Sequence, residues 1–293
     1  MRIQTLIHHL INKAINIVFW LCMIATLWFV LQVFVFASFK IPSDSMEPEL
    51  TTGDNILVWK PTIGPRIFNL FASMRNEQTE IYRIPGFKKI KRNDILVFNF
   101  LHPNSWDKIE LHILKYYIKR CIALPGDTLS IQNGIYRINN SNLLIGNIDS
   151  QNEMAKQNKA DFPKGVYNSF PYDSIIDWNI KDFGPLYIPG KGDSITMSRT
   201  NFWLYKKPIE WEQKGKLEYR DSIVFLNEKP IDGYRFQENY YFMAGDKGIN
   251  SQDSRYWGLL PEEYIVGKAW IIWKSVDPHT GKFRRERFLH KIN

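Results

Sequence analysis

Cysteine and histidine are scarce in this 293-residue chain, which contains two cysteines and six histidines. Cys22 lies within a long apolar run and Cys121 within a strand-like run, so no disulfide framework is predicted. The histidines show no spacing that would place two of them on one face beside a carboxylate ligand. We therefore expect neither a metal site nor a bound cofactor.

The chain also lacks a concentrated basic stripe, although its formal net charge is +8. Lysine and arginine are scattered rather than arrayed along one helix, which favours an ordinary basic surface over nucleic-acid binding. Hydrophobic residues make up 44% and aromatic residues 15% of the chain, too much for general disorder. The sequence predicts one large or two small packed domains.

One long stretch, residues 17–39, has no charged residue at all. At about 1.5 Å rise per residue, a helix of this length spans a hydrocarbon core of roughly 30 Å. The alternative is a cleavable signal peptide, whose apolar region usually has about 7 to 15 residues and ends at a small-x-small site. This run is longer and ends in Phe-Ala-Ser-Phe-Lys, a poor cleavage site.

These features predict a short tail over residues 1–13, a transmembrane anchor over 14–39 and a folded domain over 40–293; the function inferred below places the tail in the cytoplasm and the domain outside it. Charge bias does not decide the orientation, because Arg2 and Lys13 precede the apolar run while Lys40 and Lys60 follow it. The orientation therefore rests on the function inferred below.

Beyond the anchor, short runs of β-branched, aromatic and apolar residues are bounded by Gly, Asp, Asn and Pro, which is typical of strands. Asn133-Gly134 lies between alternating flanks and predicts a tight hairpin. The sequence predicts a mainly β fold, an antiparallel β domain with an inserted β-rich subdomain at about 140–220. The clearest predicted strands are 55–59, 94–98, 117–124 and 222–226.

The first motif directly follows the apolar run and contains Ser43 and Ser45, with Pro42 and Pro48 stiffening the chain on either side. On its own, Ser-x-Ser beside prolines is usually a turn. A serine hydroxyl also needs a base before it can act as a nucleophile.

The second motif surrounds Lys119, which strand alternation places on one face with Tyr117, Cys121 and Ala123. Burial on this largely apolar face would lower the lysine pKa from about 10.4 toward roughly 7 to 8, as a general base requires. The alternative is a solvated strand lysine whose stem packs on its neighbours. Arg120 points to the other face and stays charged.

The third motif, residues 243–258, begins as a Gly/Asp/Asn loop and contains Asp253 and Arg255 two residues apart. Its simplest interpretation is a surface loop with an exposed ion pair.

Together the three motifs resemble those of the type I signal peptidases, membrane-bound enzymes that remove signal peptides from exported proteins. Ser-Asp-Ser-Met-Glu-Pro-Glu-Leu is similar to the family's S-x-S-M-x-P-T-L box, and Tyr-Ile-Lys-Arg-Cys-Ile-Ala-Leu-Pro-Gly-Asp to its Y-I-K-R-V-I-G-L-P-G-D box. The third resembles G-D-N-x-x-x-S-x-D-S-R-Y-W-G. Glu49 and the stretch 247–249 depart from the pattern, and Lys119, rather than histidine, resembles the bacterial branch.

The resemblance implies that Ser45 is the nucleophile and Lys119 the general base. It also implies that the Ser43 hydroxyl and the Ser45 backbone N–H form the oxyanion hole. Ser/Lys pairs are a known variant of triad chemistry, and one oxyanion donor contributes about 100-fold or more in rate.

The same resemblance implies supporting roles in the third motif. Ser251 would hold the Lys119 amine, while Asp253 and Arg255 would brace the loop. Family substrates have small residues at the first and third positions before the cut, but spacing does not identify the pocket residues here.

The expected partners are signal-peptide-bearing preproteins and the lipid bilayer, with no nucleic acid. The expected location is the bacterial cytoplasmic membrane, crossed once, with the catalytic domain on the periplasmic face. Aromatic residues in 59–71 could dip into the interface or pack in the core. The basic stretch 282–288 could meet anionic headgroups or remain a solvated tail.

Two alternatives remain open. A self-cleaving regulator of the SOS-repressor kind shares the dyad, but it carries a DNA-binding helix-turn-helix where this chain has an apolar run. An inactive envelope scaffold of the same fold would not need Ser45, Lys119 and Ser251 together.

Overall fold

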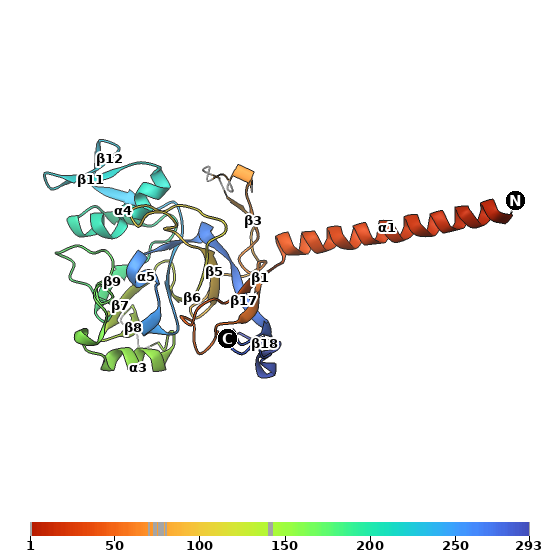
Figure 1. Cartoon of the computed structure of the whole chain (residues 1–293). Helices are drawn as coiled ribbons and strands as arrows, with labels where there is room; N and C mark the ends of the chain where they lie inside the picture. The colour runs from red at the N-terminus through yellow and green to blue at the C-terminus, as the bar shows by residue number, and fades with distance from the viewer. Residues whose placement is uncertain are drawn as a thin grey trace.

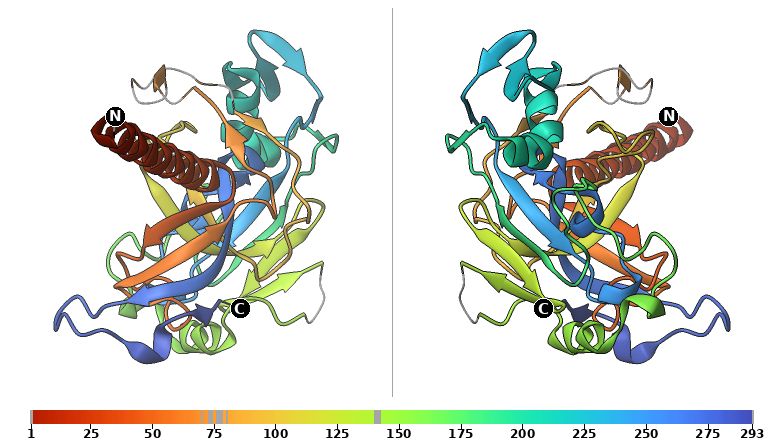
Figure 2. Two further views of the ribbon diagram at one scale, coloured as in Figure 1. Left: turned by 90° about the vertical axis from the view of Figure 1, so that its right-hand side faces the viewer. Right: turned by 90° about the vertical axis from the view of Figure 1, so that its left-hand side faces the viewer.

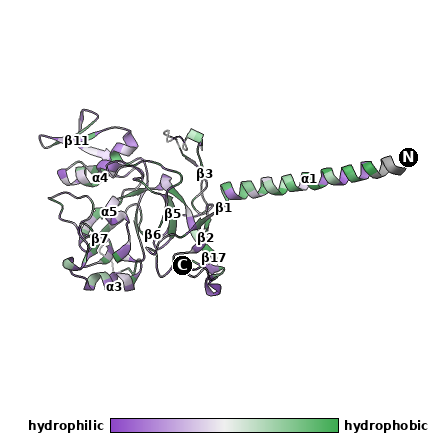
Figure 3. Cartoon of the chain, viewed as in Figure 1, coloured by the Kyte–Doolittle hydropathy of each residue, from purple (hydrophilic) through white to green (hydrophobic). Residues whose placement is uncertain are grey.

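The computed structural model describes residues 2–69, 71–72, 75, 79, 81–139 and 143–292. Helix α1 (Arg2–Phe34) projects from one side of a β-rich domain (Figure 1). Its surface is mostly apolar (Figure 3). By length and composition, Ile7–Phe34 can cross a membrane, and none of its most apolar window is buried against the domain.

The helix ends five residues before the predicted end of the anchor, because the chain turns into a strand. β1 (Phe36–Lys40) pairs in antiparallel register with β2 (Asp54–Trp59). At the helix end, Lys60 Nζ donates hydrogen bonds of 2.8 and 2.9 Å to the carbonyls of Gln32 and Val33, which lack helical partners there. At the other end the helix already includes most of the predicted tail.

The described residues form an eight-stranded main sheet with strand order β1-β2-β17-β5-β6-β15-β16, in which β18 also pairs with β17. All its strand pairs are antiparallel. The further strands are β5 (Ile95–Asn99), β6 (Tyr116–Ala123), β15 (Tyr240–Ala244), β16 (Leu260–Pro261), β17 (Ile265–Ser275) and β18 (His290–Lys291). The prediction of a mainly antiparallel β fold is confirmed.

The four predicted strands correspond to β2, β5, β6 and β12 with ends that agree to within a residue. The predicted hairpin also forms between β7 (Thr128–Gln132) and β8 (Ile135–Ile138). Its turn residues Asn133 and Gly134 have φ values of 48° and 84°. Two positive φ values are what a tight hairpin turn needs, so local chemistry determined this element.

Between β6 and β15 the chain leaves the main sheet and builds smaller sheets, with α3 and α4 at opposite ends of the domain (Figures 1 and 2). The sheet orders are β8-β7-β9, β10-β14 and β11-β12-β13. The elements are α3 (Ile148–Lys156), β9 (Phe183–Tyr187), β10 (Ser194–Thr196), α4 (Arg199–Gln213), β11 (Leu217–Arg220), β12 (Ile223–Leu226), β13 (Lys229–Ile231) and β14 (Gly233–Arg235).

This region is helical as well as β-structured, so its description as β-rich is incomplete. Ser198 caps α4 by accepting a hydrogen bond from the Asn201 N–H, and Phe202, Tyr205 and Ile209 are buried at helical spacing. Pro208, inside the helix, masks this pattern in the sequence. The predicted start of the insertion, 140–142, lies outside the described residues.

Short elements complete the chain around these sheets. They are β3 (Arg66–Ile67), β4 (Tyr82–Arg83), α5 (Ser254–Trp257) and the 3-10 turns η1 (Lys159–Asp161), η2 (Gly248–Asn250), η3 (Glu262–Tyr264) and η4 (Arg285–Arg287).

The basic stretch 282–288 is held by ion pairs rather than free in solvent. Arg284 pairs with Asp277, and Arg287 Nη2 lies 2.6 Å from Oδ2 of Asp54, whose side chain is fully buried. Burial alone would raise the pKa of Asp54, but the Arg287 guanidinium and the Thr51 N–H hold it below its usual value. The ion pair thus fixes the end of the chain against the start of β2.

We expect Arg287→Ala to lower the free energy of unfolding by about 3 kcal/mol, because it leaves the Asp54 carboxylate buried without its counter-charge. Arg285→Ala, which removes an exposed arginine of the same turn, should change stability by less than about 0.5 kcal/mol. Denaturant unfolding of both variants measures the difference. Equal stabilities would show that the buried pair does not stabilise the fold.

Candidate active site

Ser45 lies in the connection between β1 and β2, in a segment held by apolar anchors on both sides. Ile41, Met46 and Leu50 are each at most 2% exposed and pack in one core cluster with residues of β2, β5 and β17. Fully burying such a side chain stabilises a fold by about 1.5–3 kcal/mol. Ser45 therefore lies on an ordered segment. It is itself only 9% exposed.

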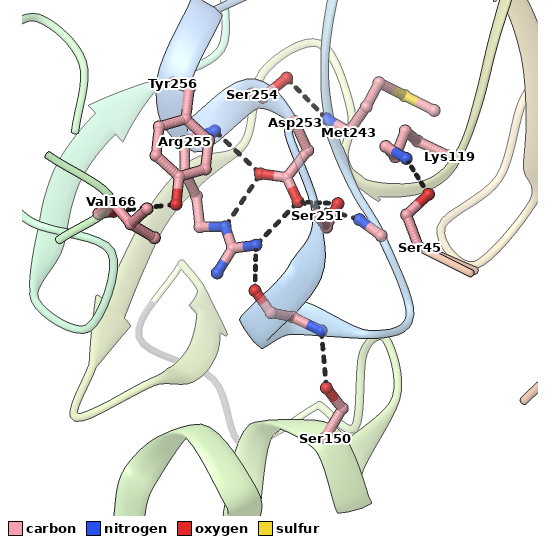
Figure 4. Close-up of polar contacts among 12 residues, drawn as sticks. Ser45, Lys119, Ser150, Val166, Met243, Ser251, Asp253, Ser254, Arg255 and Tyr256 are labelled. Atoms are coloured by element: carbon pink, nitrogen blue, oxygen red, sulfur yellow. Dashed lines mark hydrogen bonds and ion pairs between the residues drawn. The ribbon is translucent and has the colours of Figure 1, made fainter. Parts of the chain in front are cut away.

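Lys119 lies in β6, between β5 and β15 in the main sheet. Its residue is 4% exposed, and Nζ donates a hydrogen bond of 2.6 Å to Ser45 Oγ (Figure 4). Seventy-four positions separate the two residues, so the sheet brings the first and second motifs together.

Burial is the main cause that lowers the pKa of Lys119, to about 8. The negative charge of Asp253 opposes this shift, while the positive charge of Arg255 adds to it. In the described residues, Lys119 forms no ion pair of its own. A lysine with this pKa is partly neutral near pH 7 to 8 and can then accept the proton of the Ser45 hydroxyl.

Ser43 is exposed, and its Oγ lies 3.5 Å from Ser45 Oγ. The backbone N–H of Ser45 has no hydrogen-bond partner among the described residues. One hydroxyl and one backbone N–H are thus available beside Ser45 Oγ, which is the donor set expected for an oxyanion hole.

Asp253 organises the third motif from a fully buried position. It accepts hydrogen bonds from Ser251 Oγ at 2.7 Å and from the Gly245 N–H at 3.0 Å. Arg255 donates to both carboxylate oxygens, through Nε at 2.9 Å and Nη2 at 2.8 Å (Figure 4). Burial alone would raise the Asp253 pKa, but Arg255 holds it below its usual value. The expected exposed ion pair is in fact buried.

Ser251 makes a different contact from the one predicted. Its hydroxyl donates to Asp253, and no hydrogen bond joins it to Lys119 within the described chain. Ser251 is nevertheless close to the nucleophile segment: a β-carbon on Gly245 would lie 2.2 Å from Ser251 Oγ and 2.6 Å from the Ser45 carbonyl oxygen. The absence of a side chain at 245 lets the two segments pack closely.

A second buried pair fixes the start of the same loop. Arg120 donates to both oxygens of Asp246, through Nε at 2.7 Å and Nη2 at 2.6 Å. Burial would lower the pKa of Arg120, but Asp246 raises it above its usual value. Arg120 therefore stays charged, as expected, and it also connects the Lys119 strand to the loop.

Sequence reasoning missed a clamp around Lys247, which it noted only as a departure from the family pattern. Lys247 Nζ lies 2.6 Å from Asp44 Oδ2 and 3.0 Å from Glu47 Oε2. The backbone N–H of Lys247 donates to the Ser45 carbonyl. Asn250 donates to Asp44 as well. The sequence did contain a signal for these contacts, namely two acids on either side of Ser45 and a lysine in the third motif.

No group of three or more His, Cys, Asp or Glu side chains that could hold a metal ion occurs among the residues described.

Comparison with known proteins bears on this site. The family model described as "Signal peptidase, peptidase S26" matches residues 12–274. The chain belongs to this signal peptidase family. The match spans all three motifs and confirms the resemblance to type I signal peptidases. Because the family is one of peptidases, its members are hydrolases that cleave peptide bonds.

Individual signal peptidases I are similar along most of the chain. That of Buchnera aphidicola subsp. Schizaphis graminum is 32% identical, covering 85% of this chain and 71% of the relative. That of Pseudomonas aeruginosa is 27% identical, covering 84% and 67%. A solved signal peptidase I of Enterococcus faecalis is 19% identical and aligns with a TM-score of 0.31 over 62% of this chain and 97% of that chain.

We expect Lys247→Met to lower peptidase activity up to about tenfold while changing stability by less than about 1 kcal/mol, because a half-exposed ion pair positions more than it stabilises. Lys268→Met removes a lysine of similar exposure, which pairs with the buried carboxylate of Asp94, and should leave activity unchanged. Cleavage rates at low and high salt provide the measurement. Salt should slow the wild type toward the Lys247→Met rate, and an equal salt response of both proteins would contradict the clamp.

Proposed function

We propose that this chain is a membrane-anchored serine endopeptidase that removes signal peptides from preproteins, with Ser45 as nucleophile and Lys119 as general base. The observation that carries the proposal is the 2.6 Å contact between Ser45 Oγ and the amine of a lysine that is 4% exposed. Family membership supports the peptidase activity, and the names of the similar proteins support the substrate class.

In the proposed mechanism, neutral Lys119 takes the Ser45 hydroxyl proton as Oγ forms a bond to the carbonyl carbon of the scissile peptide. The carbonyl oxygen becomes an oxyanion, which accepts hydrogen bonds from the Ser45 N–H and the Ser43 hydroxyl. The Lys119 ammonium then gives its proton to the leaving amine as the C–N bond breaks. The signal peptide is left as an ester on Ser45.

In the second half of the reaction, water is the nucleophile and Ser45 is the leaving group. Lys119 accepts a proton from water, whose oxygen attacks the ester carbonyl, and returns it to Ser45 Oγ as the C–O bond breaks. The nearby carboxylates of Asp246 and Asp253 both bond to arginines, so they do not form an ion pair with the ammonium of Lys119. This arrangement keeps the lysine easily deprotonated.

Helix α1 supplies the proposed single-pass anchor, with the domain from residue 36 onward on the extracytoplasmic face. Aromatic rings gather where the helix meets the sheet: Phe36 lies 5.0 Å from Trp59 and 6.3 Å from Trp270 between ring centroids. Trp270 is 46% exposed. Exposed tryptophan beside a spanning helix is typical of a membrane interface, which supports placing this end of the domain on the bilayer.

Ser45→Ala and Lys119→Arg should each abolish cleavage of a signal-bearing precursor by the detergent-solubilised protein. Alanine lacks the nucleophile, and a guanidinium does not give up its proton at working pH. Lys115→Arg, an exposed lysine of the adjacent segment, is the matched control and should retain full activity. Mass spectrometry of the new amino terminus measures the cut. Turnover by the Ser45 variant would disprove the mechanism.

The loss of activity at low pH should reflect the protonation of Lys119. Because the neutral amine is the active form, kcat/KM should rise with pH through an apparent pKa near 8. A profile that is flat between pH 6.5 and 9 would exclude Lys119 as the base.

The lowered pKa of Lys119 also predicts how the free energy of unfolding changes with pH. Since the folded pKa, about 8, lies below the unfolded value, the cost of burying the charge is complete below pH 8 and vanishes as pH approaches about 10.5. Lys119→Met should therefore be inactive yet about 1–3 kcal/mol more stable at pH 7, with a gap that narrows toward pH 9.5. Thermal unfolding across this range measures it, and a gap independent of pH would contradict the assignment.

A further inference from the structure

A large groove opens beside the third motif, outside the dyad itself. Its volume is about 1040 Å³, at the upper end of the range for small-molecule sites. Four large side chains with substantial exposure line it: Trp106, Tyr172, Trp203 and Ile249. They come from the loop after β5, the segment before β9, α4 and η2. A contiguous apolar surface of this kind marks a binding site rather than ordinary surface.

Three consecutive residues that line the groove also contact the segments that carry Ser45 and Lys119. Asn250 donates to Asp44, next to Ser45, and Gln252 accepts from the hydroxyl of Tyr117, which lies on the Lys119 strand. Between them, Ser251 packs against Gly245 beside the Ser45 carbonyl. The groove therefore adjoins the segments that carry the dyad.

The position of the groove relative to α1 gives the direction of that chain. α4 and α5 lie on the side of the domain away from α1 (Figure 1). Under the proposed function, the apolar segment of a signal peptide would lie in the same bilayer as α1, so residues before the cut would approach Ser45 from that side. Residues after the cut leave toward the groove.

We propose that this groove binds the segment of the preprotein that follows the cleavage site. The inference rests on the proposed function. Several residues of an extended peptide fit a groove of this volume, with apolar side chains against Trp106 and Trp203.

The charges of the groove favour acidic residues in that segment. Lys206 and Lys207 line it against a single carboxylate, Asp107. Lys206 lies 3.9 Å from Glu210, whereas Lys207 forms no ion pair within the described part of the chain. The Asp107 carboxylate acts on Lys207 from a distance without an ion pair, so a carboxylate of the substrate would supply a direct partner.

Two precursors test the proposal, with one signal segment and cleavage site but with either two or twelve residues after the cut. The full chain in detergent should cleave the longer one with a kcat/KM higher by about fivefold or more, since loss of one aromatic anchor typically has this effect. Trp203→Ala should bring the long-to-short ratio close to one. Ile223→Ala, an exposed residue of β12 outside the groove, should leave the ratio unchanged.

A second pair of precursors tests the charge preference. Both have twelve residues after the cut, with either two aspartates or two lysines near it. The wild type should prefer aspartate by about fivefold, and Lys207→Gln should remove the preference. Absence of both the length and the charge dependence in the wild type would overturn the inference alone. A Trp203→Ala loss that is equal on both lengths would also overturn it and would place the signal segment in the groove. Failure of the wild type to cleave either precursor would overturn the proposed function, and the inference with it.

Discussion

The amine of Lys119 is buried in the sheet within hydrogen-bond distance of the Ser45 hydroxyl, and the neighbouring strands and loops are arranged around this contact. Holding Lys119 with a pKa near 8 costs on the order of 3 kcal/mol in its charged form. The fold tolerates this because β6 is an inner strand of the sheet, hydrogen-bonded on both sides to β5 and β15. Ser45 meets the amine only because apolar anchors hold its segment against the same sheet.

The charges around the dyad follow from the same constraint. Asp246 pairs with Arg120 and Asp253 with Arg255, and both pairs are buried, whereas the Lys247 contacts with Asp44 and Glu47 are half exposed. Asp246 and Asp253 thus each have an arginine, while Asp44 and Glu47 share Lys247. Among the described residues Lys119 forms no ion pair, so its ammonium loses a proton more readily than an ion-paired one would.

Sequence patterns predicted the elements whose structure is local. Asn133-Gly134 encodes its own turn, and alternation located β2, β5 and β6. The end of α1 was misplaced, because an apolar run looks alike in a helix and in a strand such as β1. Pro208 concealed α4, since proline inside a helix argues against it.

For the site, sequence patterns indicated the chemistry but not every contact. Ser45 and Lys119 stood out as a pair only through the family motifs, and the sheet then brought them within hydrogen-bond distance. Whether Ser251 bonds to Lys119 or to Asp253 depends on loop positions that no spacing encodes. The groove joins residues from Trp106 to Tyr256, so nothing in the linear order indicates it.

The junction of α1 with the sheet also determines the distance between the end of the helix and Ser45. Only Val35 separates the helix from β1, and Lys60 joins the helix end to the end of β2 through the carbonyls of Gln32 and Val33. β1, with five residues, extends roughly 16 Å toward the nucleophile segment. With little slack in this connection, Ser45 is held at a fixed distance from the end of α1. With α1 as the proposed anchor, the protein would work as a ruler, cutting where the distance of the substrate's cleavage site from its own apolar segment equals the height of Ser45 above the bilayer.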